Sequence, residues 1–158
     1  MTDPTYEAAA ELLEGQIAEL RKALDGCSAD ELNRRPAGDD TNSLAVLVAH
    51  ALGATRAWLS VAAGTTIPDR DRDAEFRTVV EDPRAFMAWF EEAAAGCRSV
   101  LDTDEPFEPE RVGTAPWTSQ PDAPVTAAHA LLHALEHLSE HVGHAQLTRQ
   151  LRDRGVDA

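Results

Sequence analysis

The sequence predicts an all-α protein that folds as a four-helix bundle with long crossover connections. Four stretches carry apolar residues at intervals of three and four, which is the spacing of amphipathic helices. Two of the connections between them are too long for tight turns between adjacent antiparallel helices. Aromatic residues make up only 5% of a chain that is 43% hydrophobic, so the core must consist mainly of Ala, Leu and Val, a composition that favours packed helices.

The first helix is predicted over residues 5–24, where leucines and an isoleucine recur at helical spacing between charged residues. Gly26 ends it. Ser28 and Glu31 have the spacing of a capping box, which predicts one short helical turn before the chain is broken at Pro36.

A second helix is predicted over residues 44–64, and one of three polar residues can cap it: Thr41, Asn42 or Ser43. The third, residues 82–102, begins with an N-cap aspartate followed by proline at the first helical position. The fourth is long, residues 125–152, and contains no proline.

The two remaining segments are predicted as crossovers. Residues 64–81 contain Pro68 and a charged string, Asp69 to Asp73, with no sustained period. Residues 103–124 contain five prolines and cannot form a long helix.

Length and charge narrow the class of protein. A chain of 158 residues suits a single domain, residues 1–158. Its formal net charge of -14, with Lys22 as the only lysine, argues against nucleic acid and anionic membranes as partners. The longest apolar run is too short to span a bilayer, and the N-terminus lacks the features of a signal peptide. We therefore expect a soluble, cytoplasmic protein in which Cys27 and Cys97 are reduced thiols.

Five of the six histidines lie in the fourth predicted helix. At about 100° per residue they cover about a third of its circumference, and they are His129, His133, His137, His141 and His144. Leucines and a valine occupy the opposite side. Imidazoles four residues apart can converge on one ion. The stripe could also be a plain solvated face, because His-x-x-x-His spacing arises by chance in a histidine-rich helix.

The sixth histidine, His50, lies among small residues of the second helix. It could add a third ligand and leave a fourth position open, the arrangement of catalytic rather than structural zinc. An all-nitrogen site also suits nickel, iron or copper. Ligand imidazoles must be neutral, so an ordinary pKa of about 6.5 predicts that metal affinity falls as the pH drops through about 6.5 and lower.

Two blocks of the sequence together resemble the DinB/YfiT-like superfamily. They are residues 41–59, TNSLAVLVAHALGATRAWL, and residues 132–147, LHALEHLSEHVGHAQL. The resemblance implies a bundle of up-down-down-up topology that holds a divalent metal, with zinc or nickel expected. It also implies the ligands His50, His137 and His141. His144 stands where many relatives have Gln, and it could be a fourth ligand, an outer group or a proton carrier.

The resemblance further implies a metal-dependent transferase that activates a low-molecular-weight thiol, such as mycothiol, for attack on an electrophilic small molecule. It also implies a homodimer through the second or fourth helix. A non-catalytic metal-binding or small-molecule-binding stress or resistance protein is the alternative. Three arginines could bind an anionic group of the substrate: Arg56, Arg70 and Arg72. The charged string at residues 69–73 could equally be a solvated loop. Trp58 and Trp117 could line a pocket, although packing in the core or at an interface suits them better.

Overall fold

The structure, a computed structural model, describes residues 3–116 and 123–153. Four long helices form the bundle: α1 (Pro4–Leu24), α3 (Leu44–Ala63), α5 (Pro83–Leu101) and α6 (Ala127–Asp153). Each end lies within two residues of its predicted position, so the predicted all-α bundle is confirmed. Trp117 lies outside the described residues.

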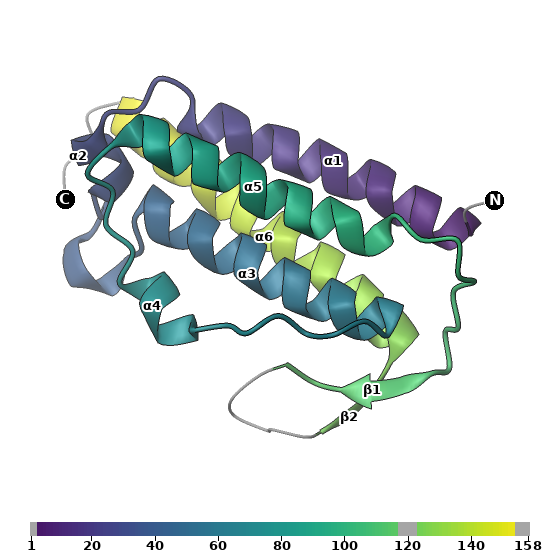
Figure 1. Ribbon diagram of the computed structural model, residues 1–158. Helices are drawn as coiled ribbons and strands as arrows, with labels where there is room; N and C mark the ends of the chain where they lie inside the picture. Colours follow the sequence, from purple (N-terminus) through teal and green to yellow (C-terminus); the bar gives the residue numbers. More distant parts are fainter. Residues whose placement is uncertain (1–2, 117–122, 154–158) are drawn as a thin grey trace.

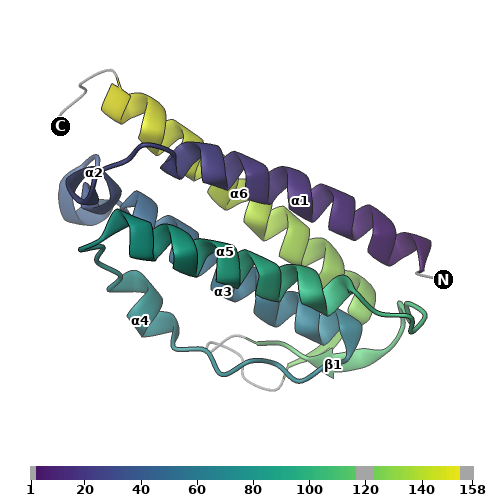
Figure 2. The ribbon, with the colours of Figure 1, turned by 45° about the horizontal axis from the view of Figure 1, so that its top comes forward.

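The helices run up-down-down-up, as the resemblance implied. Figure 1 shows α1 and α6 running in one direction and α3 and α5 in the other. Around the bundle, α6 packs against both α1 and α3, and α5 packs against both α3 and α1. Because the consecutive helices α3 and α5 are parallel, the chain must return along the length of the bundle between them (Figures 1 and 2). That return explains the long connection after residue 64.

Local signals at the helix ends match the structure. Ser43 caps α3, its hydroxyl accepting a hydrogen bond from the backbone N–H of Val46 at 3.3 Å. Gly64 ends that helix in the left-handed conformation, with φ of 70°. The short helix α2 (Ala29–Asn33) begins with the predicted capping box, in which Ser28 and Glu31 each bond to the other's backbone N–H.

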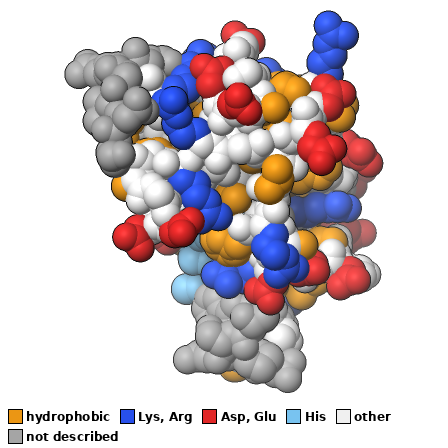
Figure 3. Space-filling view, turned by 90° about the vertical axis from the view of Figure 1, so that its left-hand side faces the viewer, with side chains coloured by type: hydrophobic (Ala, Val, Ile, Leu, Met, Phe, Trp, Pro, Cys, Tyr) orange, Lys and Arg blue, Asp and Glu red, His pale blue; other side chains and the backbone are white. Residues whose placement is uncertain are grey.

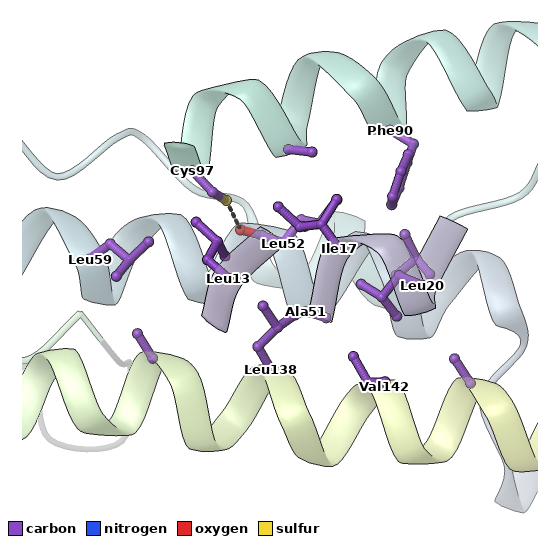
Figure 4. Packing of buried hydrophobic residues seen from close by; sticks show 14 of the residues in the cluster. Leu13, Ile17, Leu20, Ala51, Leu52, Leu59, Phe90, Cys97, Leu138 and Val142 are labelled. Carbon is purple, nitrogen blue, oxygen red and sulfur yellow. Dashed lines mark hydrogen bonds between the residues drawn. The ribbon is translucent and has the colours of Figure 1, made fainter. Parts of the chain in front are cut away.

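The core draws on all four long helices (Figure 4). Leu13 and Ile17 of α1, Leu52 of α3, Phe90 of α5 and Leu138 of α6 are each at most 1% exposed. Burial of such a side chain contributes about 1.5–3 kcal/mol. Helix α3 lies at the centre, with seventeen of its twenty residues buried.

The expectation that the longest apolar run is too short to span a bilayer is wrong, because the segment Gly38–Ala63 is long and apolar enough to cross a membrane. However, 89% of its apolar window is buried inside the bundle. This segment is therefore a core helix, and a soluble protein fits the structure.

Four short elements were missed by the sequence prediction. They are a 3-10 turn, η1 (Gly38–Asp40), a five-residue helix, α4 (Arg72–Phe76), and two paired strands, β1 (Val112–Thr114) and β2 (Pro124–Thr126). Each is too short to show a period in the sequence. Helix α4 is held at its start by Asp71, whose side chain accepts from the N–H of Ala74 at 2.8 Å. This helix lies inside the segment predicted as an irregular connection.

Candidate metal centre

Two neighbouring helices bring three histidines together. His50 lies near the middle of α3, while His137 and His141 lie one turn apart on α6. Helix α3 packs more extensively against α6 than against any other element. The sequence-predicted ligands therefore face one another across the principal interface of the bundle.

The geometry of the three rings suits a single metal ion. One nitrogen from each of the three imidazoles lies within 4.8 Å of the other two. The Nε2 atoms of His137 and His141 are 3.3 Å apart. Two nitrogens that each stand about 2.0–2.1 Å from a tetrahedral zinc ion are separated by about 3.3–3.4 Å. The pair on α6 is thus spaced as two ligands of one ion would be.

His50 has polar partners at the Nδ1 atom of its ring. Its Nδ1 lies 3.1 Å from Oε2 of Glu75 and 3.2 Å from Nη2 of Arg70. Arg70 in turn donates two hydrogen bonds to the carboxylate of Glu75, of 2.6 and 2.7 Å. Phe76 lies against the His50 ring, with 4.7 Å between ring centroids. With Nδ1 engaged in this way, Nε2 is the nitrogen left for an ion.

Burial lowers the pKa values of the two α6 histidines, His137 and His141. Burial, reinforced by the neighbouring imidazoles of His141 and His50, lowers the pKa of His137 from 6.5 to about 3. Burial, reinforced by the imidazoles of His50 and His144, lowers the pKa of His141 to about 4. Both rings are therefore neutral well below pH 6.5. The expected loss of metal affinity at low pH stays a prediction, and for these two ligands the lowered pKa values place it below pH 6.5.

The Nδ1 atoms of His137 and His141 are buried and have no hydrogen-bond partner within the part of the chain that the structure describes. Buried imidazole nitrogens normally have one. On the face that Figure 3 shows, a small area of histidine side chain is visible at the surface.

The other three histidines of α6 lie outside the converging group. The His133 ring packs edge-on against Trp58, with 4.5 Å between centroids, and stacks with His129. His144 is exposed and its ring centroid lies 5.5 Å from that of His141. Trp58 is only 4% exposed and belongs to the core.

A cleft of about 580 Å³ lies between α3, α4 and α5, and both Arg70 and Glu75 line it. Arg56, Arg70, Phe86 and Trp89 are among its lining residues, and no histidine lines it. Of the three candidate arginines, Arg72 instead stacks over Phe76, 4.8 Å from the ring centroid. The interpretation of residues 69–73 as a purely solvated loop is wrong for Arg70, whose side chain is 15% exposed in its ion pair with Glu75.

Sequence reasoning missed Glu75 and Phe76. Both lie on α4, and neither belongs to a recognisable spacing with His50. The one hint was Gly53, a glycine in an apolar helix three residues after His50. A Cβ at Gly53 would collide with Oε1 of Glu75, so glycine at this position admits the carboxylate.

Both cysteines are free and buried, as expected of reduced thiols. Burial raises the pKa of Cys97 to about 12. Its Sγ donates to the carbonyl of Leu52 at 3.6 Å (Figure 4). Cys27 lies beside Arg152, with 2.9 Å between Sγ and Nη1. Neither thiol belongs to the histidine group.

The fold and the three converging histidines place the chain among helical-bundle proteins with a candidate metal centre. Comparison with known families shows which of these it belongs to. The family model of mycothiol S-transferases matches residues 9–154, so the chain belongs to that family. It is DinB-like, as the resemblance indicated. No curated protein matches the chain.

Solved structures share the fold. A conserved protein from Enterococcus faecalis superposes with a TM-score of 0.72 at 20% identity, covering 96% of this chain and 98% of the other. YfiT from Bacillus subtilis, described as a probable metal-dependent hydrolase with an unusual four-helix bundle topology, has a TM-score of 0.66 at 18% identity. That match covers 98% of this chain and 90% of YfiT.

Proposed function

We propose that the chain is a divalent-metal-dependent transferase that activates a low-molecular-weight thiol, mycothiol or a close analogue, for attack on an electrophilic small molecule. The observation that carries the proposal is the convergence of His50, His137 and His141 in a member of the mycothiol S-transferase family. We propose zinc or nickel as the ion, two of the metals that imidazole ligands suit.

A divalent ion held by these histidines would supply an open coordination position at which a thiol loses its proton. The chain's own contribution is to keep His137 and His141 neutral by burial. Glu75 and Arg70 contact Nδ1 of His50, which leaves its Nε2 for the ion. In the transfer, the thiol sulfur forms a bond to the electrophilic carbon, and the leaving group departs with its bonding electron pair.

The protein's own thiols do not suit the role of nucleophile. Cys97 is fully buried, and its raised pKa of about 12 keeps it protonated. Cys27 packs against Arg152 near the end of α6, away from the converging histidines. The attacking sulfur therefore arrives with the co-substrate.

A turnover assay with mycothiol and an electrophilic bimane tests the proposal, with wild type beside His141→Ala. We expect wild-type turnover that is lost with the metal in the variant. Stoichiometric metal without turnover over a panel of thiols would instead support a non-catalytic metal-binding or small-molecule-binding protein.

We also propose that the 158 residues act as one domain, in the cytoplasm and as a homodimer. Because α3 is almost wholly buried, α6 is the better of the two helices named for the dimer interface. It exposes Leu132 and Leu147, at 69% and 55%. Sedimentation of a 17.1 kDa species at micromolar concentration would contradict the dimer.

A further inference from the structure

We infer that α4 is a positioning element for the metal centre: Glu75 accepts the Nδ1–H of His50 and thereby directs Nε2 toward the ion. The inference rests on the proposed metal site and assigns it a residue outside the three histidines. Carboxylates that accept the second N–H of a metal-bound histidine fix its tautomer and orientation, and their loss weakens metal binding about 10- to 100-fold.

The contacts around His50 favour this hydrogen-bond direction. A carboxylate only accepts, and its Oε2 lies 3.1 Å from Nδ1, so a bare Nδ1 would face it with a lone pair. Arg70 also lies near, with Nη2 at 3.2 Å from Nδ1, but its Nε–H and one of its two Nη2–H groups already donate to Glu75. Arg70 therefore holds the carboxylate in place, and the carboxylate holds the imidazole.

The rest of the local structure is arranged for the same contact. Phe76, the next residue of α4, lies against the His50 ring and restricts its rotation. Gly53, one helical turn after His50, leaves the notch through which Glu75 reaches α3. The side chain of Glu75 is only 12% exposed, so the carboxylate is taken from water for this contact.

The state of the His50 ring can be measured without any metal. In the metal-free wild-type protein, ¹H–¹⁵N spectra of the imidazoles should show His50 with its proton on Nδ1. Glu75→Ala should lose that signature, and Glu75→Gln should keep it, because the amide oxygen still accepts. An Nε2–H tautomer in wild type, with Nδ1 accepting from Arg70, would overturn the inference.

Zinc affinity, measured by chelator competition on the full chain, gives the second readout. Glu75→Ala should bind zinc about 10- to 100-fold more weakly, with Glu75→Gln between it and wild type. The matched control is Asp73→Asn, which removes the same charge from an exposed position of the same helix. It should change affinity less than about twofold. An equal loss in Asp73→Asn and Glu75→Ala would reduce the effect to net charge and overturn the inference.

Gly53→Ala separates positioning from stability. Alanine suits a helix better than glycine, so the melting temperature should hold or rise while zinc affinity falls. Unchanged affinity in Gly53→Ala and Glu75→Gln would overturn the inference even if Glu75→Ala failed to fold. If the wild-type protein bound no metal, the proposed function would be contradicted. Equally tight zinc binding in the wild type and in every variant would contradict only the role of α4.

Discussion

The two helices that supply the histidines hold them in different ways. On α3, His50 is fixed from behind by Glu75 and Arg70 and flanked by Phe76. On α6, the Nδ1 atoms of His137 and His141 are buried without a partner among the described residues. The α6 pair relies on helical spacing and close packing to aim its rings. The single histidine of α3 has no such neighbour in its own helix and depends on a short element from the crossover.

The difference predicts unequal effects of substitution along α6, and these are the largest effects we expect. His137→Ala should weaken zinc binding more than about 100-fold, which exceeds the loss expected when a carboxylate behind a ligand, such as Glu75, is removed. His144→Ala should change it less than about threefold, because His144 is exposed and lies outside the converging group. Chelator competition on both variants measures the contrast. Comparable losses would extend the centre to four histidines.

The anchor behind His50 gives the next prediction. Arg70→Lys keeps the charge but cannot donate two parallel hydrogen bonds to Glu75. We expect zinc affinity to fall about 3- to 10-fold, less than for removal of Glu75 itself. Arg72→Lys is the matched control on the same segment, because Arg72 contacts Phe76 and not the carboxylate. Equal affinity in all three proteins would show that the clamp on Glu75 has no influence on the site.

The lowered pKa values on α6 predict a pH dependence of the metal-free protein. The pKa values of His137 and His141, about 3 and about 4, lie below the ordinary 6.5. Between about pH 6.5 and 4, the unfolded chain therefore binds more protons than the folded one, and the free energy of unfolding falls as the pH drops. Above that window these two groups contribute no pH dependence.

Denaturant unfolding with a chelator present, at several pH values, tests this point. His137→Asn removes one buried imidazole, so its stability should decline less between pH 6.5 and 4 than that of wild type. Parallel curves for the two proteins would show that His137 is not held neutral by burial.

The smallest expected effect concerns the thiol of Cys27, which does not belong to the converging histidine group. Cys27→Ser should leave thiol-transfer turnover within about twofold of wild type, because the nucleophile arrives with the co-substrate. Rates with mycothiol and a bimane give the comparison. A large loss of rate with zinc content unchanged would make Cys27 the nucleophile and leave the metal site standing.

The sequence was informative where local rules apply and silent where contacts are made by tertiary structure. Helical spacing placed His137 and His141 on one face, and capping signals at residues 41–43 and at Asp82 located the starts of α3 and α5, with Ser43 as the cap that the structure uses. The resemblance implied His50 as their partner. Nothing in the sequence pairs Glu75 with His50, because the carboxylate arrives on a five-residue helix from a crossover. Burial, which sets the pKa values of the α6 pair, likewise follows only from the packed bundle.

The central claim is that His50 on α3 completes a metal centre begun by two histidines on α6. Elemental analysis of protein purified without an affinity tag tests it most directly, with wild type beside His50→Ala and His129→Ala. The account predicts about one equivalent of a divalent ion per chain in wild type and in His129→Ala, and less than about a tenth of that in His50→Ala. A metal-free wild type, or a His50→Ala variant that retains its full equivalent, would contradict it.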